Sequence, residues 1–119
     1  MRTVQIGSVE VPLRPPASFA VGRAVIVGMQ GNSILGLGAA LGACWGGKPL
    51  RATLKAHGFS VCDYGAAVVD ELYGLGVPEA DIWAAASVAL EVLTGAQLTE
   101  AGVAAAESFT APTTGASTP

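Results

Sequence analysis

Apolar and polar residues alternate over the first part of the chain, as they do in half-buried strands. The alternation predicts one strand over Thr3–Ile6 and a second over Val9–Leu13. Gly7 and Ser8 lie between them and suit a two-residue hairpin turn with glycine in the first position. Because Pro12 has no N–H to give, we expect the second strand to lie on an open edge.

Helical spacing replaces this alternation after the hairpin. Ser18 suits the cap of a helix that runs to about Met29, because a serine oxygen accepts hydrogen bonds from the first turn. Residues 31–33, Gly-Asn-Ser, break this helix and cap a second one over residues 34–45.

The second helix is rich in small residues. Each glycine in a helix costs about 1 kcal/mol relative to alanine, so a helix that keeps several usually gains from close packing. We therefore expect another helix to approach this face closely. The small residues are Gly38, Ala39, Gly42 and Ala43.

Two further helices are predicted before residue 75. Pro49 suits the first turn of a short basic helix over residues 50–57, which Gly58 ends. Ser60 suits the cap of the next helix, over residues 62–73.

The clearest helical period covers residues 79–94, and Gly95 is expected to end that helix. A last, alanine-rich helix is predicted over residues 98–109. Residues 110–119 are mostly Thr, Pro, Gly, Ser and Ala, which is typical of a flexible tail. The fold class is therefore mainly α (α+β): a single domain, residues 1–109, with an N-terminal hairpin at 3–13 and five to six packed helices.

Charge is divided between the two halves of the chain. Residues 1–55 hold all six cations and one acid, whereas residues 56–119 hold eight acids and no cation. A split of this kind suits head-to-tail self-association, and it equally suits attraction between the halves of one monomer. The candidate residues for these contacts are Lys48, Arg51 and Lys55 on one side, and Asp70, Glu71 and Glu79 on the other.

The surface is predicted to be poor in charge. Charged residues make up 13% of the chain, against about 25% in ordinary soluble domains. Either a partner covers some apolar surface, or alanine and glycine raise the apolar count without forming apolar patches. The net charge of −3 argues against general nucleic-acid binding, which needs a basic face.

A membrane span is not expected. Residues 24–47 carry no charge, but Gln30 to Ser33 interrupt them. The remaining pieces are shorter than the roughly 20 helical residues that cross a bilayer. Without a signal peptide, Cys44 and Cys62 are expected to be free thiols in a reducing compartment.

No catalytic, cofactor or metal site is predicted. Gly36, Gly38 and Gly42 resemble a dinucleotide loop, but their spacing is off by one, and Trp45, two glycines and another helix follow where the motif needs a second parallel strand. Cys44, His57, Cys62 and Asp63 lack the short spacings of a zinc site, and His57 suits a helix C-terminus. Two pairs of acids lie close in sequence, Asp70 with Glu71 and Glu79 with Asp81, but neither pair has a partner base or nucleophile. The chain is therefore expected not to be an enzyme. A small enzyme or nucleotide-binding module is a third hypothesis, after the two that are described below.

The order of motifs resembles that of the small tail assembly chaperones of long-tailed bacteriophages and prophages. The residues that carry the resemblance are Val-Pro-Leu-Arg-Pro-Pro (11–16), Ala-Leu-Gly-Ala-Cys-Trp (40–45), Ala-His-Gly-Phe (56–59), Asp-Tyr-Gly (63–65), Val-Val-Asp-Glu-Leu (68–72) and Gly-Val-Pro (76–78).

The resemblance implies a helical, non-enzymatic protein of the bacterial host cytoplasm. Such chaperones bind the tape-measure protein, keep its apolar helices soluble and yield to tail-tube subunits. They commonly self-associate, so a homo-oligomer is expected, and the Thr110–Pro119 tail would suit a linker to a frameshift extension. The resemblance implies no catalytic residue, cofactor, nucleic acid or membrane.

For the partner we predict a groove lined from the second and fifth helices, around Leu37, Leu41, Trp45 and Trp83, because these are large side chains on faces of small residues. The alternative function is a virion structural protein, a capsid-decorating or tail-completion subunit in a homo-oligomeric ring.

Overall fold

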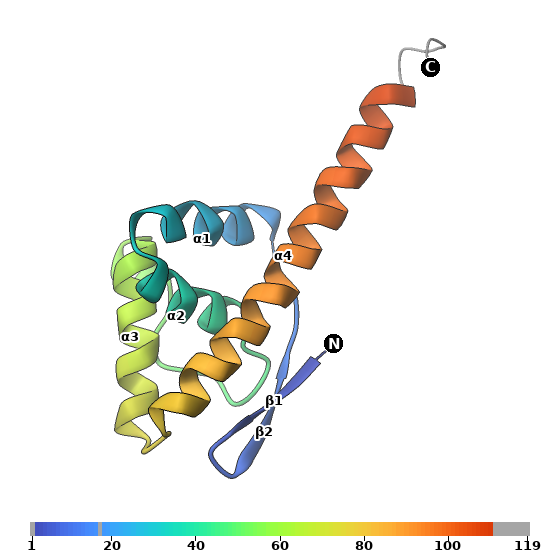
Figure 1. Ribbon diagram of the computed structural model, residues 1–119. Helices are drawn as coiled ribbons and strands as arrows, with labels where there is room; N and C mark the ends of the chain where they lie inside the picture. Colours follow the sequence, from blue (N-terminus) through green and yellow to red (C-terminus); the bar gives the residue numbers. More distant parts are fainter. Residues whose placement is uncertain (1, 17, 111–119) are drawn as a thin grey trace.

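The N-terminal hairpin forms where the alternation predicts it. In the computed structural model, which describes residues 2–16 and 18–110 and side chains as far as Leu98, strand β1 (Arg2–Ile6) pairs antiparallel with β2 (Val9–Leu13). Gly7 has φ +62°, as the predicted glycine-first turn requires. Four α-helices follow in the described part of the chain (Figure 1).

The first two helices meet at the predicted break. Helix α1 (Phe19–Gly31) is capped by Ser18, and α2 (Ser33–Cys44) is capped by Asn32, whose side-chain oxygen accepts from the Leu35 N–H at 3.0 Å. These side-chain caps satisfy N–H groups that a helix start leaves free, so the local sequence is enough to place both helices.

The small residues of α2 receive another helix, as predicted. That helix is α3 (Val61–Gly74), capped by Ser60. A side chain at Gly38 would meet the Gly65 carbonyl of α3, and one at Gly42 would meet the Tyr64 hydroxyl. At Gly65 a side chain would overlap the Leu35 carbonyl. Glycine on both helices therefore lets the two backbones touch.

The short basic helix over residues 50–57 was a wrong prediction. Only Lys55–His57 form a single 3₁₀ turn, and residues 46–54 are a loop. In this loop the Glu71 carboxylate of α3 accepts from the Arg51 and Ala52 N–H groups. Lys48, Arg51 and Lys55 therefore do not share a helix face.

The predicted helix end at Gly95 was also wrong. One helix, α4 (Glu79–Thr110), replaces the two that were predicted, so the described chain has four α-helices and not five to six. Beyond Gly95, the Gln97 side chain is buried and its Nε2 donates to the Phe19 carbonyl of α1 at 3.1 Å. This contact holds α4 to α1 past the glycine. Thr110, the first residue of the predicted tail at 110–119, is the last residue of α4, and residues 111–119 lie outside the described residues.

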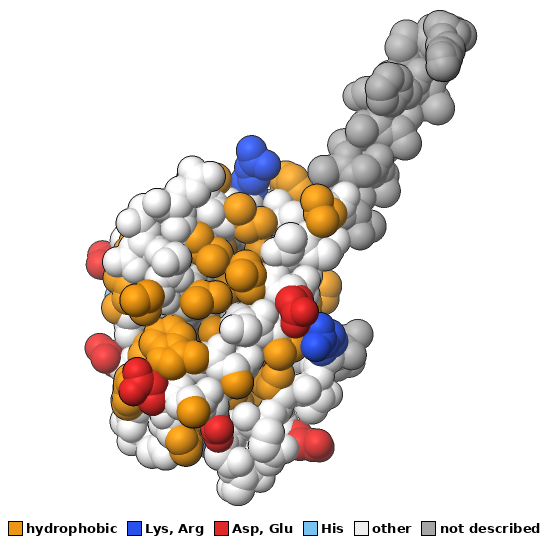
Figure 2. All heavy atoms as spheres, viewed as in Figure 1, with side chains coloured by type: hydrophobic (Ala, Val, Ile, Leu, Met, Phe, Trp, Pro, Cys, Tyr) orange, Lys and Arg blue, Asp and Glu red, His pale blue; other side chains and the backbone are white. Residues whose placement is uncertain are grey.

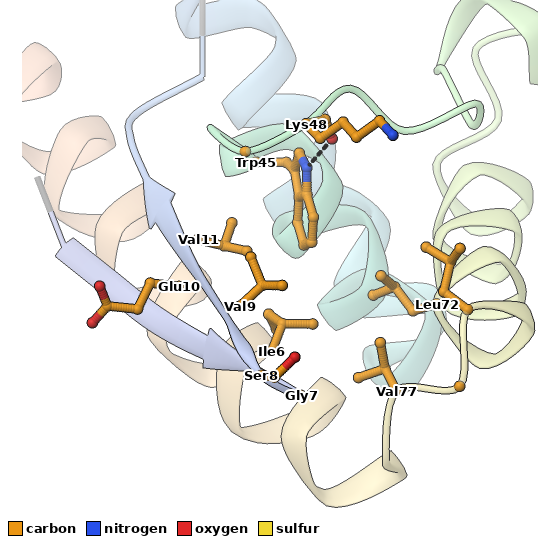
Figure 3. A pocket seen from close by; sticks show the side chains of 13 residues that line it. Ile6, Gly7, Ser8, Val9, Glu10, Val11, Trp45, Lys48, Leu72 and Val77 are labelled. Atoms are coloured by element: carbon orange, nitrogen blue, oxygen red, sulfur yellow. Dashed lines mark hydrogen bonds between the residues drawn. The ribbon is translucent and has the colours of Figure 1, made fainter.

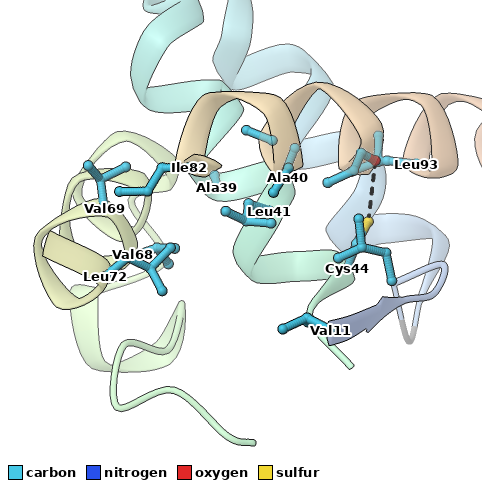
Figure 4. Packing of buried hydrophobic residues seen from close by; sticks show 14 of the residues in the cluster. Val11, Ala39, Ala40, Leu41, Cys44, Val68, Val69, Leu72, Ile82 and Leu93 are labelled. Carbon is cyan, nitrogen blue, oxygen red and sulfur yellow. Dashed lines mark hydrogen bonds between the residues drawn. The ribbon is translucent and has the colours of Figure 1, made fainter. Parts of the chain in front are cut away.

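Helix α2 lies at the centre of the molecule. Its buried face packs between α3 and α4, with Leu41, Val68, Leu72, Ile82 and Leu93 among the buried side chains (Figure 4). The hairpin closes the core from the side, through Ile6, Val11 and Leu13. Within the described residues, no helix has the length and apolar character needed to cross a bilayer.

Candidate partner-binding groove

An apolar hollow opens between the hairpin and the turn that joins α3 to α4. Its volume is about 360 Å³, within the range of small-ligand and side-chain pockets. Figure 3 shows side chains from β1, β2, the end of α2 and α3 pointing toward it. The side chains that define it are Ile6, Val9, Val11, Trp45, Leu72 and Val77.

The hairpin is fastened to α4 at two places, and these contacts hold one wall of the hollow. The Gly7 N–H donates to the Asp81 carboxylate at 3.0 Å, and Arg2 forms an ion pair with Glu91 at 3.2 Å. From the sequence alone, Asp81 is only an acid beside Glu79 with no partner base or nucleophile. Its role in holding the hairpin turn depends on a contact between residues far apart in the sequence.

The Trp45 side chain lines both this hollow and a second one. Its indole Nε1 donates to the Lys48 carbonyl at 2.7 Å, which fixes the ring (Figure 3). The second hollow, about 300 Å³, lies toward the loop and is lined by Trp45, Lys48, Pro49, Leu50, Arg51, Glu71 and Leu75. We call the two hollows together the Trp45 groove; they have Trp45, Lys48 and Leu75 in common.

Large apolar side chains are exposed along the Trp45 groove. Val9 is 59% exposed and Leu75 is 70% exposed.

A second apolar area lies between α1 and the first half of α4, where hydrophobic side chains gather and charged ones stand mostly toward the margins (Figure 2). Exposed apolar surface of this kind is typical of sites that bind a partner.

The structure separates the four predicted partner-binding residues. Leu41 is fully buried in the core, so it offers no surface to a partner. Leu37 and Trp83 are partly buried and line neither hollow of the groove. Trp83 Nε1 donates to the Glu79 carboxylate at 3.1 Å. Trp45 alone of the four lines the groove, and its partners there, Val9 and Leu75, come from segments with no sequence signal that links them.

Among the described residues, none of the predicted cations forms an ion pair with a predicted acid. Glu71 binds loop amides and Glu79 binds Trp83, whereas Asp70 is exposed on α3. The ion pair found among the described side chains is Arg2–Glu91, which joins the basic first half of the chain to the acidic second half. Lys48, Arg51 and Lys55 take no part in it.

Glu71 is expected to control the order of the loop that borders the groove. Its carboxylate accepts from Arg51 N–H at 2.8 Å and from Ala52 N–H at 2.9 Å. Glu71→Ala should cost about 1–3 kcal/mol of local stability, because both amides lose a charged acceptor. Hydrogen exchange at these two amides should rise about tenfold or more, while exchange at buried α2 amides stays unchanged. Glu71→Gln keeps one oxygen acceptor and should give an intermediate rate; equal rates in all three proteins would contradict the assignment.

Both cysteines are free in the structure. Cys44 is buried, and its Sγ donates to the Ala89 carbonyl at 3.5 Å. Burial raises the pKa of the Cys44 thiol to about 11, so the thiol is protonated and unreactive at neutral pH. Burial also raises the pKa of Tyr64, with smaller contributions from Cys44 and Glu71. Among the described residues, no three His, Cys, Asp or Glu side chains group as metal ligands would.

Comparison of the chain with protein-family models, with curated protein sequences and with solved structures gives no match.

Proposed function

We propose that this chain is a non-enzymatic assembly chaperone that holds apolar segments of a longer partner in the Trp45 groove. By the resemblance of its motifs to small phage tail assembly chaperones, the partner is a tape-measure protein, which the chain keeps soluble in the host cytoplasm and later yields to tail-tube subunits.

The observation that carries this proposal is the Trp45 groove itself. A tryptophan held by its own ring N–H stands between two apolar hollows, beside the exposed side chains of Val9 and Leu75. Rigid aromatic side chains of this kind commonly supply most of the energy of a protein interface. Most of the side chains that line the first hollow are apolar, which suits apolar side chains of a polypeptide.

Co-expression with the tape-measure protein, followed by affinity capture, tests the proposal. Trp45→Ala should reduce the captured partner by about tenfold or more, the loss expected for a central aromatic anchor. Val9→Asp should do the same without touching the core, because Val9 is mostly exposed. Trp83→Ala is the matched control: it removes a partly buried tryptophan outside the groove and should leave capture unchanged.

Two outcomes would contradict the proposal. Capture that survives both groove variants would remove the groove from the partner interaction. Presence of the chain in purified, mature particles would favour the virion structural alternative, since a chaperone leaves before the particle is complete.

A further inference from the structure

The second strand of the hairpin has a backbone edge that faces away from β1. The Pro12 carbonyl points to that side and accepts from the Gly46 N–H at 2.9 Å. Backbone groups of alternate residues in a strand point the same way. The N–H and C=O of Glu10, two residues earlier, therefore also point away from β1.

The chain itself covers only one end of this edge. Trp45 forms an isolated antiparallel bridge with Leu13, and Arg14 N–H donates to the Cys44 carbonyl at 3.0 Å. The chain then bends away at Gly47 and Lys48. At Glu10 the described part of the chain supplies no partner for the outward N–H and C=O, and Glu10 lines the first hollow of the Trp45 groove.

Side chains on the two faces of β2 differ in kind. Val9 and Val11 point toward the hollow, whereas Glu10 points to the opposite face of the hairpin (Figure 3). The cross-strand neighbour of Glu10 is Gln5, which is neutral. The Glu10 carboxylate makes no ion pair with a described residue. Lys48 lines the groove, so its positive charge disfavours a basic side chain of a partner inside the hollow.

We propose that the open edge of β2 takes an extended segment of the partner as an added strand, with a basic residue opposite Glu10 and apolar residues on either side. The inference rests on the proposed role of the groove as a partner site, but not on the name of the partner. The added strand continues the pairing that the Trp45 segment begins. Its apolar side chains fill the hollow beside Val9 and Val11, and its basic side chain meets Glu10 on the outer face.

Two other occupants fit the edge less well. A helix satisfies its own backbone groups, so it would leave the Glu10 N–H and C=O unpaired. A second copy that paired its own β2 in the register centred on Glu10 would set Glu10 opposite Glu10, and like charges directly opposite are unfavourable. A partner strand with an apolar–basic–apolar pattern satisfies both the backbone edge and the charge.

Short peptides added to the intact protein test this inference. The first is a blocked peptide of about seven residues, an ordinary strand length, with valine on both sides of a central lysine. The second has glutamate in place of the lysine. The third is a longer amphipathic peptide with leucines at helical spacing. Binding is followed by titration calorimetry, and strand addition is followed by protection of the Glu10 amide from hydrogen exchange.

The lysine peptide should bind about two- to five-fold more tightly than the glutamate peptide, the range of one cross-strand charge pair, and should protect the Glu10 amide. Glu10→Lys should reverse the order of the two peptides. Asp70→Lys, which moves the same charge on exposed α3, should leave the order unchanged.

Glu10→Pro isolates the backbone contribution. The Glu10 N–H faces away from β1, so the hairpin keeps its own ladder, and Pro12 already occupies the same edge. Proline should weaken the lysine peptide about tenfold, whereas Glu10→Gln, which keeps the N–H, should weaken it less.

Binding of the helical peptide alone would overturn the added strand while leaving the groove as a partner site. Equal binding to Glu10→Pro and to the unaltered protein would overturn it too, and so would failure of every peptide in a protein that still captures its full-length partner. Two results together would support the inference: the unaltered protein prefers the lysine peptide, and Trp45→Ala loses both partner capture and peptide binding.

Discussion

Gly65→Ala should lower the free energy of unfolding by about 3 kcal/mol. A methyl group at this position of α3 would overlap the Leu35 carbonyl and come within 3.0 Å of the Ala39 N atom. Both are backbone atoms of α2, so no side chain can rotate to make room and the two helices must separate. Overpacking in a core typically costs 1–3 kcal/mol, and here it also opens the contact at Gly38 on the facing helix.

Urea denaturation measures this effect as a lower midpoint with an unchanged slope. Gly74→Ala is the matched control, since it lies on the same helix and nothing is within 4 Å of its added carbon. It should be neutral or stabilising by up to about 1 kcal/mol, because alanine favours the helix. A Gly65→Ala protein as stable as the control would mean that α2 and α3 do not pack this closely.

Leu41→Asp should prevent folding altogether. Leu41 is fully buried on α2, and the substitution both removes a large apolar side chain and buries a carboxylate. The first effect costs about 2–5 kcal/mol and the second adds several more. The total approaches the whole stability of an ordinary domain, about 5–15 kcal/mol.

Circular dichroism and solubility on expression measure the result. Leu75→Asp introduces the same carboxylate at a side chain that is 70% exposed, and it should change stability by about 0.5 kcal/mol or less. It should nevertheless weaken partner capture, because Leu75 lines both hollows of the Trp45 groove. A folded, soluble Leu41→Asp protein would contradict the burial of this residue.

The elements that could be predicted are those with local causes. Alternation and a two-residue turn define the hairpin, and Ser18, Asn32 and Ser60 cap the helices that follow them. The close approach of another helix to α2 also followed from its small residues, although their sequence does not say that α3 is the one.

The errors arose where a distant residue decides the local structure. Residues 50–57 have the composition of a short helix, but Glu71 bonds the backbone of the loop from α3. Gly95 suggests a helix end, but Gln97 fixes the helix to Phe19 of α1. The groove was missed for the same reason: Trp45 is visible as a large side chain, whereas Val9 and Leu75 become its neighbours only through the fold.

The contacts that fasten the hairpin have a consequence for synthesis of the protein. Gly7 is bound to Asp81 and Arg2 to Glu91, so the hairpin is held in place by residues 74 and 89 positions later in the chain. Contacts this distant in sequence form late in folding, and a chain emerging from the ribosome lacks them until α4 has been translated past Glu91. The wall of the groove is therefore held in place only after Glu91 has been translated, and a nascent chain that stops before α4 lacks it.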